Sequence, residues 1–182
     1  PGALLQVVDK DGNVVEEWIS TDKPHEIVAK LVVDESYVLR EVRPADGWAY
    51  AEDVPFKVSH DGTVDYVKME DKPTHVVISK QEITGSKELP GCTLQVIDKN
   101  GNVVDEWFST DQPHEIKEKL IADEEYTLRE VRPADGWAYA EDIPFKVSHD
   151  GTVDQVKMED KPTHVVVSKK KITGKEELPG CH

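Results

Sequence analysis

The sequence repeats itself at a fixed spacing, and this repetition constrains the fold more than any other feature. Residues 5–71 recur as residues 94–160, so each position in the first copy has a counterpart 89 residues later. The segments LREVRPADGWAYAED and PFKVSHDGTVD are identical in the two copies. A shorter match relates residues 74–92, THVVISKQEITGSKELPGC, to residues 163–181, THVVVSKKKITGKEELPGC. The chain is therefore a tandem array of one small unit.

The repeat boundaries divide the chain into three predicted segments. Residues 1–72 form a repeat that lacks its first strand, residues 73–161 form a complete repeat, and residues 162–182 supply the first strand and turn of a further repeat. The link Asp71-Lys72-Pro73 is short and contains proline. We therefore expect the repeats to follow one another as a stiff rod.

Short segments of the complete repeat alternate apolar and polar residues, which is typical of strands with one buried face. Turn signals separate segments that we expect to be strands at 93–98, 103–110 and 126–131, followed by a hairpin of 143–148 and 152–159. Leu94 and Val96 are expected to face inward and Ile97 outward. Residues 111–120 carry Ile116 and Leu120 at helical spacing, which predicts one short helical turn. The pattern predicts an all-β fold, with a small immunoglobulin-like β-sandwich in each repeat.

The charge balance excludes several classes of function. The chain has 37 acidic and 22 basic residues and a net charge of −15. Nucleic-acid binding requires a basic face, so neither nucleic acid nor an anionic membrane surface is an expected partner. No apolar run approaches the ~20 residues of a membrane span, so we expect no membrane insertion, and targeting and anchoring segments would lie outside these 182 residues.

No cofactor or metal is expected. The repeated histidines lack metal-ligand spacing, and the turns DKDGN and DKNGN lack the glutamate of a calcium loop. Cys92 and Cys181 occupy equivalent positions in successive repeats, so a disulfide between them is not expected. Cys92 alternates with Leu94, which predicts a small residue that faces the core.

Three segments of the complete repeat each place a charged residue in line with two apolar ones. The rows are Val76-Ile78-Lys80, Tyr126-Leu128-Glu130 and Val156-Met158-Asp160. Alternate residues of a strand share a face, so each row brings one ionisable group to the end of an apolar face. Buried charges are costly unless they are paired, so these three groups are expected to meet.

Two interpretations of this cluster remain open from the residues alone. The first is a buried network of ion pairs. In the second, burial favours the neutral form of both amines and carboxyl groups. Lys80 can then attack the side-chain carbonyl of Asp160, while Glu130 polarises that carbonyl and transfers protons. The product would be a Lys–Asp amide that ties the first strand to the last.

The motifs around these residues resemble the Cna B-type (SpaA-like, prealbumin-like) domains of Gram-positive surface adhesins and pilins. They are a lysine before the TG and LPG turn, the strand YTLRE followed by PADGW, and an aspartate that closes the last strand. The resemblance implies a small β-sandwich with a self-formed isopeptide bond, in which Lys80 is the amine, Asp160 the acyl partner and Glu130 the catalytic acid. Cys92 replaces the usual alanine, and Trp137 stands where tyrosine is more usual.

The first repeat has counterparts of two of these three residues. Glu41 and Asp71 are present, whereas the lysine strand is missing. The remaining equivalent lysine is Lys169, in a row with Val165 and Val167.

We hypothesise that residues 163–178 complete the first repeat of the same or a neighbouring chain, and that a Lys169–Asp71 bond seals it. The stiff link opposes pairing within one chain, whereas donation between chains would give head-to-tail chains or rings. The alternative is that both ends are simply incomplete repeats.

These observations predict a structural stalk rather than an enzyme, because each domain would react once with itself. The resemblance implies an extracellular, cell-wall-attached surface protein whose partners are neighbouring repeats. An alternative is a ligand-binding adhesin module that recognises a glycan or host protein, with the four tryptophans as a candidate platform. An engineered covalent assembly unit is a further alternative.

Overall fold

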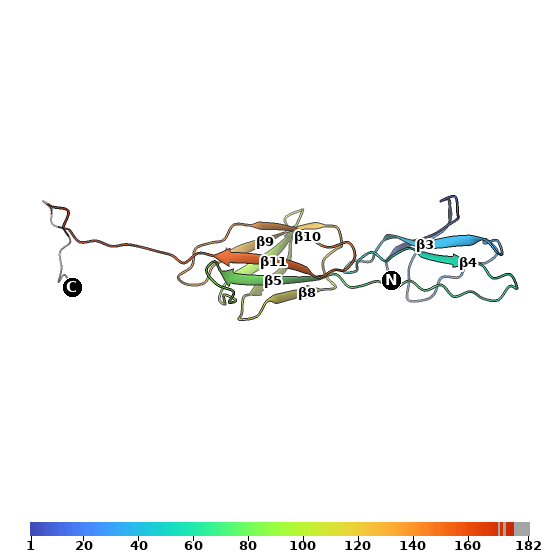
Figure 1. Cartoon of the computed structure of the whole chain (residues 1–182), viewed down its shortest axis with the longest axis horizontal. Helices are drawn as coiled ribbons and strands as arrows, with labels where there is room; N and C mark the ends of the chain where they lie inside the picture. The colour runs from blue at the N-terminus through green and yellow to red at the C-terminus, as the bar shows by residue number, and fades with distance from the viewer. Residues whose placement is uncertain (171, 173, 177–182) are drawn as a thin grey trace.

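The computed structural model describes residues 1–170, 172 and 174–176, and the two repeats follow one another along its long axis (Figure 1). Among these residues there are eleven strands and no helix. The described part of the chain accordingly contains no helix that could cross a membrane.

The first repeat contains one four-stranded sheet with the order β2-β1-β3-β4. Its strands are β1 (Leu4–Val8), β2 (Val14–Ile19), β3 (Ser36–Arg43) and β4 (Val54–Lys57). The second repeat contains the equivalent sheet β10-β9-β6-β7 and a three-stranded sheet β11-β5-β8. Its strands are β5 (His75–Glu82), β6 (Thr93–Asp98), β7 (Val103–Phe108), β8 (His114–Lys117), β9 (Glu125–Arg132), β10 (Ile143–Lys146) and β11 (Asp154–Asp160).

The core of the second repeat lies between its two sheets. Buried residues alternate along β5, β9 and β11, as expected when one face of each strand is turned inward. Thirteen buried apolar residues form this core. The predicted all-β sandwich is therefore confirmed. Ile97, which was expected to face outward, is buried because a β-bulge shifts the register between Val96 and Ile97.

The helical turn predicted for residues 111–120 is wrong. This segment contains β8, which pairs antiparallel with β5. Ile116 and Leu120 are both buried, but Ile116 lies in the strand and Leu120 follows it in a loop. Their spacing of four residues fits a helix, yet pairing with β5 supplies the backbone hydrogen bonds that a single helical turn would leave unmade.

The predicted final hairpin is also wrong. β10 pairs antiparallel with β9, whereas β11 pairs parallel with β5 in the other sheet. The turn at Asp150-Gly151 therefore lies where the chain crosses from one sheet to the other. A turn signal reports a local change of direction and does not specify which strand becomes the next partner.

The first repeat lacks the second sheet. The counterparts of β8 and β11, residues 25–28 and 65–71, form no strand. Its buried apolar cluster contains only Val7, Tyr37 and Leu39 among the described residues. The physical reason is visible in the second repeat, where β5 lies between β8 and β11 and pairs with both. Without a counterpart of β5, neither neighbour has a partner.

The two repeats meet in a joint built mainly from backbone groups. Ala49 N donates to Lys72 O at 2.8 Å, and Thr74 N donates to Gly47 O at 2.9 Å. Gly47 has a φ of +84°, and a Cβ there would lie 2.5 Å from the backbone carbonyl of Glu118. Only glycine allows this close approach without strain.

A stacked pair of rings completes the joint. Tyr50 N donates to the carbonyl oxygen of His149 at 2.9 Å. The rings of these two residues stack with their centroids 4.2 Å apart.

Residues 163–170, which follow the second repeat, are extended and exposed. They lead away from the end of the second repeat opposite the first repeat (Figure 1). Val165, Val166 and Val167 are 81%, 82% and 88% exposed. Residues 171, 173, 177 and 178 of the hypothesised donor segment, and Cys181, lie outside the described residues.

Candidate functional site

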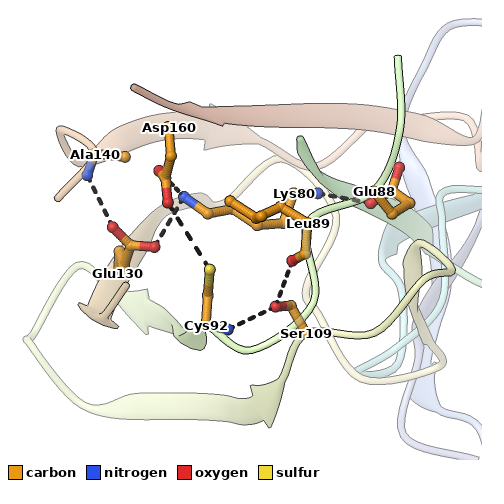
Figure 2. A network of polar contacts seen from close by, with 8 residues as sticks. All are labelled: Lys80, Glu88, Leu89, Cys92, Ser109, Glu130, Ala140 and Asp160. Atoms are coloured by element: carbon orange, nitrogen blue, oxygen red, sulfur yellow. Dashed lines mark hydrogen bonds and ion pairs between the residues drawn. The ribbon is translucent and has the colours of Figure 1, made fainter. Parts of the chain in front are cut away.

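The structure brings Lys80, Glu130 and Asp160 together in the interior of the second repeat. Lys80 lies on β5 and Asp160 at the end of β11, in the three-stranded sheet, while Glu130 reaches in from β9 in the opposite sheet. Their exposed fractions are 2%, 6% and 1%. Figure 2 shows the lysine amine pointing at both carboxyl groups. The three groups therefore meet, as the alternation of apolar and charged residues along these strands predicted.

The contacts assign a different environment to each carboxyl group. Lys80 Nζ makes a direct ion pair with Asp160 Oδ1 and lies 2.9 Å from Glu130 Oε1. Glu130 Oε2 accepts a hydrogen bond of 2.8 Å from Ala140 N. Glu130 is thus fixed by the backbone at one oxygen and faces the lysine with the other.

Burial raises the pKa of Asp160 above its ordinary value, and this effect outweighs the opposing effect of Lys80. Glu130 adds to the rise through its own negative charge. A raised pKa favours the protonated carboxyl group, which is the form that an amine can attack. Burial therefore favours the protonated form of Asp160.

The turn that follows β5 holds the backbone of Lys80. Lys80 N donates to Glu88 Oε2 at 2.9 Å, and Leu89 N donates back to Lys80 O at 2.6 Å. Ser109 Oγ donates to Leu89 O at 2.7 Å. The Lys80 side chain thus extends from a strand whose position is already restrained, which lowers the entropic cost of holding amine and carboxyl together.

Cys92 is a member of the cluster that sequence reasoning missed. It is fully buried, as expected of a small core residue, but its Sγ also lies 3.8 Å from Asp160 Oδ2. Ser109 Oγ accepts a hydrogen bond from Cys92 N at 2.8 Å. Burial raises the pKa of the thiol, so it stays protonated and can donate to the carboxyl group.

One potential ligand atom each of Cys92, Glu130 and Asp160 lies within 4.8 Å of the others, close enough for a metal ion. Lys80 Nζ already contacts both carboxyl groups of this cluster. We therefore interpret the cluster as a lysine–carboxyl site rather than a metal site.

The first repeat contains the acidic half of the same site. Glu41 is 7% exposed, and its Oε2 accepts a hydrogen bond of 2.8 Å from Ala51 N. Its buried Oε1 has no hydrogen-bond partner among the described residues. Burial raises the pKa of both Glu41 and Asp71. Lys169 belongs to the segment 163–170, which leads away from the second repeat on the side opposite the first repeat, and so away from Asp71 (Figure 1).

Two of the four tryptophans that could form a glycan-binding platform have one face of the indole ring covered by a histidine. Trp107 stacks on His114 with centroids 4.1 Å apart, and Trp18 stacks on His25 at 4.3 Å. Trp48 and Trp137 form backbone bridges with the prolines that follow each repeat.

The aspartate-rich turns are hairpin turns, as expected. The carboxylate oxygen Oδ1 of Asp98 accepts hydrogen bonds from the backbone N–H groups of Asn100 and Asn102. These bonds are internal to the turn.

The fold and the cluster define a β-sandwich repeat with a buried lysine between two acidic residues. Residues 1–73 and 74–162 each match the family model of the SpaA prealbumin-like fold domain. Since the two matches cover most of the chain, the protein belongs to this family.

Solved structures with a similar fold come from Gram-positive bacteria. The Bacillus anthracis TIE protein is 17% identical with a TM-score of 0.50, and the match covers 88% of this chain but only 31% of that one. Shaft pilin SpaA from Lactobacillus rhamnosus GG is 13% identical over 91% of this chain and 89% of its own, with a TM-score of 0.45. GBS52, a minor pilin of Streptococcus agalactiae, is 13% identical over 93% and 87%, with a TM-score of 0.46. A comparison with curated proteins gives no match.

Proposed function

We propose that this chain is part of an extracellular structural stalk on a Gram-positive cell surface, and that an amide between Lys80 and Asp160 locks its complete repeat. The observation that carries the proposal is the buried contact of Lys80 with Asp160 beside Glu130, at the junction of the first and last strands. Membership of the SpaA family supports the structural role.

The reaction is a condensation that balances without any further reagent. Asp160 is protonated, and Glu130 takes a proton from the ammonium group of Lys80. The neutral amine attacks the Asp160 carbonyl carbon, and Glu130 returns that proton to the departing hydroxyl group. The second proton on nitrogen passes to Glu130 as the C–O bond breaks. One amide and one water result, and Glu130 ends protonated, as it was when the amine attacked.

This chemistry occurs once per molecule. The amine and the acyl group belong to the same repeat, and the amide remains in the interior, so no site is freed for another substrate. Glu130 has a catalytic role in this step, but the protein does not turn over.

The position of the amide suits a chain that is pulled at its ends. β5 and β11 are parallel neighbours, so force that enters before β5 and leaves after β11 loads their hydrogen bonds in shear. An amide joining Lys80 to Asp160 would bypass the residues between them. The covalent path would carry the load, and the sandwich would remain folded under tension.

Intact mass spectrometry under denaturing and reducing conditions tests the proposal. The expected mass is lower than the sequence mass by at least one water, and a proteolytic digest should yield a branched peptide containing Lys80 and Asp160. The full sequence mass, with both residues recovered on separate linear peptides, would sink the covalent proposal and leave a buried ion-pair network.

The same reasoning extends to the first repeat. Glu41 and Asp71 correspond to Glu130 and Asp160, and Lys169, on the segment 163–178, corresponds to Lys80. We propose that this segment fills the first repeat, where Glu41 would act as the acid and a Lys169–Asp71 amide would seal the contact.

A further inference from the structure

We propose that residues 163–170 of one copy insert into the first repeat of a second copy, and that the two copies dock through the contacts that already join the two repeats. Insertion requires only strand pairing and burial. The Lys169–Asp71 amide that would seal it rests on the proposed function.

The first repeat exposes the apolar surface that β5 covers in the second repeat. Val67 is 36% exposed, whereas its counterpart Val156, which pairs with Ile78 of β5, is 7% exposed. Ile27 is half-buried, whereas its counterpart Ile116 is 4% exposed. The segments of Ile27 and Val67 have no strand partner among the described residues. Unpaired edges with apolar side chains favour the addition of a strand.

The first repeat also contains a buried carboxyl group that could pair with an incoming amine. Glu41 is more than nine-tenths buried, and its Oε1 has no hydrogen-bond partner in the described part of the chain. The equivalent oxygen of Glu130 likewise accepts no hydrogen bond from the described residues, but it forms an ion pair with Lys80 Nζ at 2.9 Å. A buried carboxylate oxygen without a partner is costly, so a cation that reaches Glu41 would be stabilised there.

The donor segment matches β5 in sequence but not in environment. THVVVSK at residues 163–169 differs from THVVISK at residues 74–80 in a single position. Val76 and Ile78 are each 1% exposed in β5, whereas Val165 and Val167 are 81% and 88% exposed. Burying these two side chains removes apolar surface from water, which favours insertion.

The pairing of β5 predicts the register of the inserted strand. Val76 lies between Ile116 of β8 and Asp154 of β11. Subtracting the repeat spacing places Val165 between Ile27 and Asp65 of the second copy. Two residues further on, Val167 would lie between His25 and Val67, as Ile78 does between His114 and Val156. Lys169 then faces Glu41 and Asp71.

The end of the second repeat already has the conformation of the joint. Thr163 N donates to Gly136 O at 2.8 Å, as Thr74 N does to Gly47 O at 2.9 Å. Ala138 N donates to the carbonyl oxygen of Lys161 at 2.9 Å, the counterpart of the Ala49 contact. The direction in which the donor strand leaves the repeat is therefore set before a partner arrives.

Among the described residues, Tyr139 lacks the stacking partner that its counterpart Tyr50 has in the joint. Tyr50 stacks on His149 within the chain, whereas its counterpart Tyr139 is 67% exposed. The counterpart of His149 in the first repeat is His60, which is also exposed. Head-to-tail docking would stack Tyr139 of one copy on His60 of the next.

Distance rules out insertion into the same chain while the joint is formed. Thr163 is held at the far end of the second repeat, and the two residues from Thr163 to Val165 span at most about 7 Å. The second repeat, with its eight-residue strand β5, is at least roughly 26 Å long. The acceptor must therefore belong to another copy. Such a head-to-tail contact gives chains, or rings where the rotation closes.

Light scattering coupled to size-exclusion chromatography tests the docking, on the full chain under reducing conditions at rising protein concentration. The expected result is a series of masses at multiples of the monomer. Val167→Asp should keep the protein monomeric, because this side chain would enter the core. Val166→Asp is the matched control, since residue 166 is equally exposed but would face away from the core, and it should still assemble.

The covalent seal is tested separately with Lys169→Arg. This variant should form the same assemblies in native buffer but no ladder on a denaturing gel, whereas the parent protein should give one. Monomer at every concentration, or loss of assembly with Val166→Asp as with Val167→Asp, would overturn strand insertion in this register. Native assembly without a ladder would overturn only the Lys169–Asp71 amide. The Lys80–Asp160 bond is judged independently by the mass of the monomeric variant Val167→Asp.

Discussion

Replacing Glu130 by glutamine should prevent the amide and lower the melting temperature of the second repeat substantially. The substitution keeps the size of the side chain but removes the group that takes and returns protons. Lys80 and Asp160 are 80 positions apart. Treating the amide like any covalent closure of a loop of that length, the chain-entropy estimate is about 4.5 kcal/mol of stability at 25 °C.

That free energy converts into a measurable temperature shift. A globular repeat spanning residues 74–162 unfolds with roughly 190 cal/mol/K of entropy, at about 2.1 cal/mol/K per residue. Glu130→Gln should therefore lower the transition of this repeat by roughly 24 °C in scanning calorimetry. The intact mass should rise relative to the parent protein by the mass of one water, allowing for the substitution itself.

Two matched variants show whether the effect arises from the reaction. Glu41→Gln makes the same change at the equivalent position of the first repeat and should leave the Lys80–Asp160 bond intact. Asp160→Asn can still condense with Lys80 by releasing ammonia, so its mature mass should equal that of the parent protein. The reasoning is refuted if Glu130→Gln retains the mass deficit, or if the deficit is lost without any fall in melting temperature.

Three further predictions follow from individual contacts. Burial raises the pKa of Glu41 above its usual 4.5, so the folded first repeat binds more protons than the unfolded one. Its stability should therefore fall as the pH rises from 4.5 through the raised pKa of the folded state. Glu41→Gln should weaken this pH dependence in thermal melts from about pH 4 to about pH 8, and an unchanged slope would contradict the prediction. Gly47→Ala should destabilise the monomer more than Gly136→Ala in urea titrations. Both glycines have a positive φ, which costs about 1 kcal/mol for alanine. Only at Gly47 would the new Cβ also clash with the backbone of Glu118. The Cys92 thiol is fully buried with a raised pKa, so peptide mapping should find it unmodified by iodoacetamide in the native protein and modified after unfolding; rapid native labelling would show that the core opens.

The sequence by itself indicated that Lys80, Glu130 and Asp160 would lie together, because strand alternation is a local property. Side chains two positions apart share a face whatever the strand pairs with, so the rows ending at Lys80, Glu130 and Asp160 could be read directly. The repeat spacing likewise matched Glu41 and Asp71 to Glu130 and Asp160.

Contacts between rows of side chains could not be read in this way. The contact of Cys92 with Asp160 depends on how β5, β11 and the turn before β6 pack in three dimensions. Cys92 is two positions from Leu94, which predicted that its thiol faces the core. The alternation did not indicate which atoms the sulfur would contact. The approach of Gly47 to the backbone of Glu118 is likewise a contact between residues of different repeats.

Only the tertiary structure decided which strands are partners. β10 and β11 follow one another in sequence yet lie in different sheets, and residues 114–117 form a strand because β5 offers them an edge. The first repeat demonstrates the same point, since residues 25–28 and 65–71 closely resemble β8 and β11 in sequence but remain irregular. Local preference determines which face of a segment is apolar, but a strand forms only where another strand completes its hydrogen bonds and covers that face.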